Sequence, residues 1–106
     1  MFLAKPRLDE AGFLKNAEEW QPEIALSLAE KEGITLTKDH WQLIYFLRQF
    51  YEEFQLHPSM RVLIQQLRKD WPAEKASSLY LLELFPGGPI KQASKIAGLP
   101  KPLKCL

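Results

Sequence analysis

The chain has 106 residues, with 14 Lys and Arg against 13 Asp and Glu, and a single cysteine. This length allows one domain with a modest core, and a net charge of +1 excludes bulk attraction to nucleic acid or to a membrane surface. One cysteine excludes an internal disulfide, and no apolar run is long enough for a signal peptide or a bilayer span. We therefore expect a soluble protein in the reducing cytoplasm.

The N-terminal region predicts a small hairpin followed by a helix. Short apolar pieces at 2–4 and 12–14 flank a turn-forming stretch, which is typical of a β-hairpin. Asn16 can cap the helical stretch that follows, and Pro22 suits a first-turn position. Apolar residues then recur on one helical face, and Gly33 is placed to end this helix.

The middle of the chain predicts the longest helix. Thr37 is a good N-cap, and no glycine or proline follows it until Pro58. Apolar residues cover a wide arc of the segment, which is typical of a central, well-buried helix. These residues are Trp41, Ile44, Tyr45, Leu47, Phe50, Tyr51 and Phe54.

Three shorter helices are expected after it. Pro58 restarts the chain into a helix that is broken at 71–72, and a further helix is expected around 78–84. The proline- and glycine-rich stretch 85–89 forces a turn, and a last helix of about two turns ends at Gly98.

The predicted fold is therefore mainly α. It is a compact bundle of about five helices with a small N-terminal β-hairpin and a flexible C-terminal tail. Residues 1–106 form a single domain, in which 99–106 is a mobile, cysteine-bearing tail. Trp20, Trp41 and Trp71 stand at helix-like positions and are expected to pack in the core.

Cys105 is the residue with the clearest chemical interest. A thiol in a chain end has little core to fill, and Pro100 and Pro102 bias the preceding residues toward an extended conformation. Lys101 and Lys104 favour the thiolate, which is the nucleophilic form of the side chain. The competing interpretation is a frayed tail with an incidental cysteine.

The last sixteen residues carry a positive charge asymmetry. They contain Lys91, Lys95, Lys101 and Lys104, and no Asp or Glu follows Glu83. One interpretation is a positive region around the thiol that favours the thiolate or docks an acidic partner. The other is complementation of a helix dipole together with solubility.

Neither histidine has metal-ligand spacing with the other or with Cys105. His40 falls in the first turn of the long predicted helix, which favours a capping or surface role. His57 precedes a proline and is expected in a loop. Since Gly87-Gly88 lies between prolines and follows no strand, a phosphate-binding loop is also absent from the pattern.

The C-terminal stretch 84–106 resembles the DsrC/TusE family, and matching residues extend back through nearly the whole chain. They include Gly12-Phe13-Leu14, Trp20, Glu32-Gly33-Ile34, His40-Trp41, Phe46-Leu47-Arg48, Tyr51, Pro58 and Arg61. Two-cysteine members of the family carry their second cysteine where this chain has Ser94. The resemblance is therefore to the single-cysteine TusE branch, in which the intramolecular disulfide cannot form. Gln65 is a further departure, because the family pattern has a lysine four residues after the matching arginine.

The resemblance implies a sulfur-relay carrier, a sulfurtransferase that accepts sulfane sulfur as a persulfide on Cys105. The donor would be a TusBCD-like complex, and the recipient an MnmA-like tRNA thiolase that makes 2-thiouridine at the tRNA wobble position. The carrier itself would contact tRNA only indirectly and would need no cofactor or metal. Residues expected to position the tail or dock a partner are Arg61, Lys91, Lys95, Gly98, Pro100, Lys101, Pro102 and Lys104.

Two alternatives stay open at this point. One is a carrier that serves another sulfur pathway, since membership of a family does not determine donor or acceptor. The other is a non-catalytic binding or regulatory module, in which helices at 58–70 and 78–84 resemble a helix-turn-helix. Against DNA binding, the candidate recognition helix at 76–84 contains no Lys or Arg.

Overall fold

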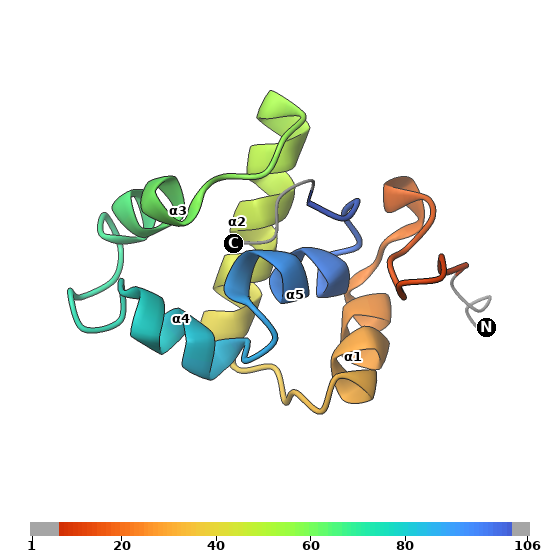
Figure 1. Cartoon of the computed structure of the whole chain (residues 1–106), viewed down its shortest axis with the longest axis horizontal. Coiled ribbons are helices and arrows are strands. Elements are labelled where there is room, and N and C mark those ends of the chain that lie inside the picture. Colours follow the sequence, from red (N-terminus) through yellow and green to blue (C-terminus); the bar gives the residue numbers. More distant parts are fainter. Residues whose placement is uncertain (1–6, 103–106) are drawn as a thin grey trace.

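A computed structural model describes residues 7–102, which form a mainly α-helical structure (Figure 1). Its elements are a short 3-10 helix and five α-helices, namely η1 (Ala17–Glu19), α1 (Pro22–Lys31), α2 (Lys38–Phe54), α3 (Met60–Leu67), α4 (Ser78–Leu84) and α5 (Pro89–Ile96). The predicted mainly α class is confirmed, and η1 is an element that the sequence pattern did not predict.

The N-terminal loop differs from the predicted β-hairpin. In residues 7–102 the β pairing consists of one isolated antiparallel bridge between Leu8 and Leu14. The Asp9 side chain accepts the backbone N–H groups of Ala11 and Phe13, both at 2.9 Å, and closes a local turn that competes with a strand ladder. Phe13 and Leu14 are buried as anchors of this loop instead. The hairpin prediction is therefore wrong, and its outer piece at 2–4 lies outside the described residues.

Local signals place the C-terminal end of α1 and the start of α2 as predicted, whereas Asn16 caps η1 and Gln21 is the N-cap of α1. Gly33 adopts φ +75° after α1, and its N–H donates to the Glu30 carbonyl at 3.0 Å. The Ile34 N–H donates to the Ala29 carbonyl at 2.9 Å, which completes a Schellman motif. Thr37 is the N-cap of α2, as expected.

His40 has the predicted capping role, and it also joins two helices. Its Nδ1 accepts the Thr37 backbone N–H at 3.1 Å, and its Nε2 lies 2.8 Å from the carbonyl oxygen of Leu84, at the end of α4. These partners fit the neutral tautomer that carries its proton on Nε2. His40 is buried and fully used in this contact, so it serves the fold.

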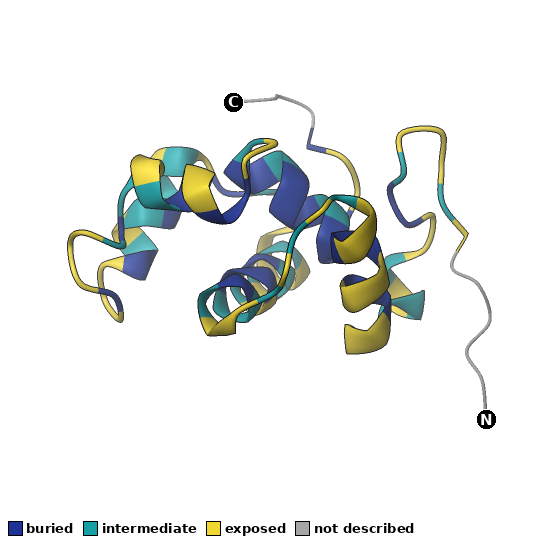
Figure 2. Ribbon diagram, turned by 90° about the horizontal axis from the view of Figure 1, so that it is seen from below, coloured by how far each residue is buried: buried dark blue, intermediate teal, exposed yellow. Residues whose placement is uncertain are grey.

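The core is built around α5, which lies across the middle of the molecule (Figure 1). This helix packs against α2, α1 and α4, and nearly all of its residues are coloured as buried in Figure 2. Its fully buried residues include Ala93, Ser94 and Ile96, and α2 contributes Leu43 and Leu47 to the same core. The end of α5 is therefore held in a defined place, and this end leads into the C-terminal segment.

Candidate functional site

The candidate site begins where α5 ends, at the root of the segment 99–106. Gly98 adopts φ +74°, its N–H donates to the Lys95 carbonyl at 3.2 Å, and the Leu99 N–H donates to the Ser94 carbonyl at 3.0 Å. This is a second Schellman motif, and it turns the chain away from the helix axis. Leu99 is only 3% exposed, so the first residue of the segment is packed into the core.

Two side chains from distant parts of the chain hold the same helix end. Trp20, directly after η1, donates its indole N–H to the Ile96 carbonyl at 3.0 Å. Arg48, on α2, donates from Nη1 to the Ala97 carbonyl at 2.6 Å, and its guanidinium carbon lies 4.2 Å from the centre of the Trp20 ring. The sequence pattern predicts Trp20 in the core, and Arg48 enters it only as one of the residues that match the family. No local signal in the sequence relates either residue to α5.

Gly98 is required by this arrangement for space as well as for conformation. A Cβ atom built on Gly98 would overlap the Trp20 ring, with Trp20 Cδ1 as its nearest neighbour. The ring can pack over the helix end only because position 98 has no side chain. Gly98, one of the predicted site residues, thus belongs to the root of the segment.

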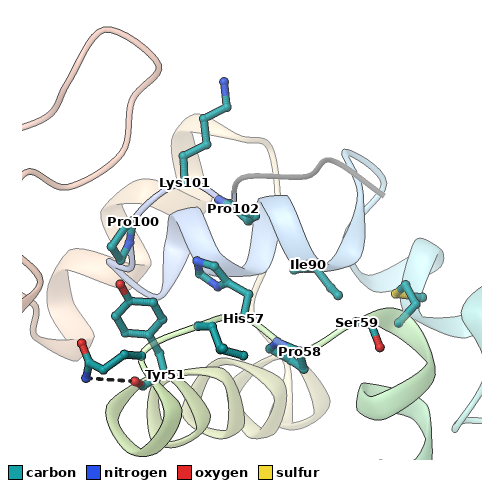
Figure 3. Close-up of a pocket in the computed structure, with 11 residues that line it drawn as sticks. Tyr51, His57, Pro58, Ser59, Ile90, Pro100, Lys101 and Pro102 are labelled. Carbon is teal, nitrogen blue, oxygen red and sulfur yellow. Dashed lines mark hydrogen bonds between the residues drawn. The ribbon is translucent and has the colours of Figure 1, made fainter.

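A cavity of about 680 Å³ lies beside the described part of this segment (Figure 3). Its lining residues are Tyr51, Gln55, Leu56, His57, Pro58, Ser59, Met60, Ile90, Pro100, Lys101 and Pro102. Of the residues predicted to position the tail, Pro100, Lys101 and Pro102 are brought together here. The Lys101 side chain extends away from the cavity into solvent (Figure 3).

His57 connects this cavity to α5. Its Nδ1 lies 3.2 Å from the hydroxyl of Ser94, the position at which two-cysteine relatives would carry a thiol. Burial lowers the pKa of His57, and the backbone of Pro100 acts in the opposite direction. A neutral imidazole is therefore favoured near pH 7 beneath the segment.

The predicted basic residues do not form one cluster. Lys95 lies 3.0 Å from a carboxylate oxygen of Glu32 and 5.8 Å from the centre of the Phe13 ring, on the side of α5 that faces α1. Lys91 is half-buried on α5 and Arg61 is exposed on α3, and within residues 7–102 neither forms a side-chain hydrogen bond or ion pair. Lys104 and Cys105 lie outside the described residues.

Three other kinds of site can be tested for in the described part of the chain: a metal site, a membrane span and a DNA-binding helix. Residues 7–102 contain no cluster of three His, Cys, Asp or Glu side chains arranged to hold a metal ion. No helix among them is both long and apolar enough to cross a membrane. On α4, within the candidate recognition helix, the exposed residues are Ser78, Leu79, Leu82 and Glu83, and none of them supplies the cation that DNA binding needs.

The fold and this site define a small helical protein whose central helix presents a capped, proline-bearing C-terminal segment with one cysteine. The family model described as "DsrC like protein" matches residues 4–106. The chain belongs to this DsrC-like family.

Individual relatives agree with this assignment. Sulfurtransferase TusE of Photorhabdus laumondii is 52% identical over 98 residues, which are 92% of this chain and 88% of the relative. Sulfurtransferase TusE of Escherichia coli K12 is 47% identical over 92% of this chain and 90% of its own length. Among solved structures, the oxidized γ-subunit of the dissimilatory sulfite reductase (DsrC) from Archaeoglobus fulgidus superposes with a TM-score of 0.88. It is 40% identical and covers 97% of this chain and 94% of that one.

Proposed function

We propose that this chain is a sulfur-relay carrier, a sulfurtransferase that holds sulfane sulfur as a persulfide on Cys105. The observation that carries the proposal is the 52% identity, over 92% of the chain, to a protein named sulfurtransferase. A second support is that the chain has one cysteine, and that this cysteine lies in the segment 99–106, whose root is held by α5 and its neighbours.

The chemistry needs only a thiolate and a partner. The Cys105 thiolate attacks the terminal sulfur of a persulfide on the donor, the donor's S–S bond breaks, and the donor's thiolate leaves. Cys105 then carries a persulfide, and a recipient thiolate removes the terminal sulfur by the same exchange, so no external oxidant or reductant is consumed. The exchange is fastest when the attacking thiol has a pKa near the ambient pH and the leaving thiol has a lower pKa.

The segment 99–106 is proposed as the arm that carries this cysteine between partners. Leu99 is packed into the core and Pro102 is buried, so the mobile part of the arm is proposed to begin after Pro102. Pro100 and Pro102 reduce the conformational entropy that is lost each time the arm docks. Lys101 and Lys104 are proposed to favour the thiolate or to contact a partner. Arg61, Lys91 and Lys95 are proposed for docking, although Lys95 is already paired with Glu32.

The partners that we propose are those that the resemblance to the DsrC/TusE family implies. The donor is a TusBCD-like complex, and the recipient is an MnmA-like tRNA thiolase that forms 2-thiouridine at the wobble position in the cytoplasm. The carrier contacts tRNA only indirectly, and no DNA or membrane is involved. A carrier that serves another sulfur pathway would use the same chemistry with a different donor and recipient.

The decisive test is intact-mass spectrometry after incubation with a persulfide donor, on the native protein and on Cys105→Ser. We expect a reducible gain of one sulfur atom in the native protein and no gain in the variant, because Cys105 is the only thiol. Circular dichroism is expected to show equal helicity in both proteins. No gain from several competent donors would contradict the proposal. Charging by an unrelated donor but not by a TusBCD-like complex would assign the carrier to another pathway.

A further inference from the structure

We infer that Trp20 and Arg48 are positioning residues for Cys105: together they clamp the carbonyl end of α5 and set the direction in which the arm leaves the domain. This inference rests on the proposed function, since it concerns how the sulfur-bearing thiol is presented. It assigns this task to Trp20, directly after η1, and to Arg48, on α2, through their contacts with the end of α5.

Side chains as well as backbone groups form the hydrogen bonds at the end of α5. A helix leaves its last carbonyl groups without partners inside the helix. Here the N–H groups of Gly98 and Leu99 take two of them, through the Schellman motif. The next two carbonyls, those of Ile96 and Ala97, are taken by the Trp20 indole and the Arg48 guanidinium. The turn into the arm is therefore held by side chains as well as by backbone.

The charge and the burial of Arg48 also favour its place at the end of α5. Arg48 is half-buried, and burial lowers its pKa, although an arginine stays protonated at any physiological pH. Its positive charge lies at the negative end of the α5 dipole and over the face of the Trp20 ring, 4.2 Å from the ring centre. A second contact, from Nη2 to the Ala17 carbonyl at 3.4 Å, connects the guanidinium to η1. One cation thus joins η1, α2 and the end of α5.

The stretch of chain between Gly98 and Cys105 connects this clamp to the thiol. Cys105 follows Gly98 by seven residues, so the thiol lies within about 24 Å of the clamp when the arm is fully extended. Pro100 and Pro102 restrict the backbone of this stretch, and Leu99 and Pro102 are both buried, so the direction set at the root persists as far as Pro102. A rigid root thus limits the volume that the thiol samples, and it raises the effective concentration of the thiol at a docked partner's site.

The experiment compares Trp20→Phe, which removes the indole N–H, with Arg48→Met and Arg48→Lys. Tyr80→Phe is the matched control, because the Tyr80 hydroxyl donates to Asp39 and also joins α2 to another helix, but far from the arm. A nitroxide attached to Cys105, the only cysteine, maps the directions that the arm visits through paramagnetic relaxation of backbone amides. Steady-state sulfur transfer from a persulfide-loaded TusBCD-like complex supplies the kinetics.

We expect the relaxation effects to spread over more of the surface in Trp20→Phe and Arg48→Met, and to stay unchanged in Tyr80→Phe. In the kinetics, KM for the carrier is expected to rise about five- to tenfold in Trp20→Phe and Arg48→Met, while kcat stays within about twofold of the native value. The reason is that a less restricted arm loses more conformational entropy when it docks, whereas the sulfur transfer itself is unchanged. Arg48→Lys keeps the charge but loses the planar fork, so it is expected to restore part of the native KM. Alkylation of Cys105 by iodoacetamide should proceed at the native rate in every variant.

Identical relaxation maps in native and clamp variants would overturn the inference, as would a KM change that Tyr80→Phe reproduces at equal loss of stability. If the native protein accepts no sulfur, the proposed function fails separately. The relaxation maps still decide whether Trp20 and Arg48 direct the arm. Because Arg48→Lys and Trp20→Phe are conservative, they keep the test informative if Arg48→Met does not fold.

Discussion

At the scale of single residues, two glycines end helices in the same way but in different surroundings. Gly33 and Gly98 both follow an α-helix, with φ values of +75° and +74°. A Cβ on Gly33 would meet nothing within 4 Å, whereas one on Gly98 would run into the Trp20 ring. The pair therefore separates the conformational part of a glycine's role from the part that depends on close packing.

We predict that Gly33→Ala lowers the free energy of unfolding by about 1 kcal/mol, the usual cost of a left-handed conformation for a residue with a Cβ. Gly98→Ala should cost at least about 2 kcal/mol, because the indole must also move and lose its bond to Ile96. Urea denaturation of the two variants measures the difference. Equal losses of unfolding free energy in the two variants would show that the Trp20 ring can move away from residue 98 without destabilising the protein.

At the scale of elements, a network of polar side chains connects the end of α1 to α5. Glu32, at the end of α1, accepts from Gln92 at 2.9 Å and pairs with Lys95 at 3.0 Å. The Gln92 side chain also accepts the Gly87 N–H at 2.8 Å, which holds the turn before α5. The hydrogen bond from Gln92, followed by that from Lys95, lowers the pKa of Glu32 below its ordinary value of 4.5.

We predict that Glu32→Gln lowers stability at pH 7 by about 0.5–1 kcal/mol, as expected for a partly exposed ion pair. Because the folded pKa of Glu32 is lowered, its contribution is complete above pH 4.5 and is lost as the pH falls through the folded value. The stability difference between native and variant should therefore shrink below pH 4.5. Urea denaturation at pH 7 and near pH 3 tests this, and a constant difference would contradict it.

At the scale of the whole molecule, one core supports both the fold and the root of the arm. Leu47 of α2 is fully buried against the cluster that contains Ile96 and Leu99, so the packing of α2 on α5 also holds the beginning of the arm. By contrast, Leu26 of α1 is 53% exposed and contributes little to this cluster. Loss of core packing should therefore affect global stability and the position of the arm together.

We predict that Leu47→Ala lowers the free energy of unfolding by about 2–5 kcal/mol, the range for a buried leucine that leaves a cavity. Leu26→Ala, at an exposed position, should change it by less than about 0.5 kcal/mol. Thermal denaturation followed by circular dichroism checks both. A loss of similar size in the two variants would show that Leu26 contributes as much packing as Leu47, and would contradict the prediction.

The sequence by itself determined the helical class and most helix ends, because these depend on neighbouring residues. Gly33, Thr37 and the break before α4 act through backbone groups a few positions away, so their effects can be predicted without the fold. The predicted hairpin failed for a related reason. A strand pair needs a packing surface, and the side chain of Asp9 offered the backbone a local turn instead.

Only the tertiary structure decided how the arm is rooted. Trp20 reaches Ile96 across 76 residues and Arg48 reaches Ala97 across 49, and no periodicity or spacing relates such positions. Lys95 likewise pairs with Glu32 across 63 residues, although the charge pattern of the sequence groups it with the lysines of the arm. Contacts of this kind form only when the burial of apolar faces has brought the helices together. The sequence thus singled out Cys105, which is proposed to carry the chemistry, whereas the packing of α5 decided where the segment before it leaves the helix.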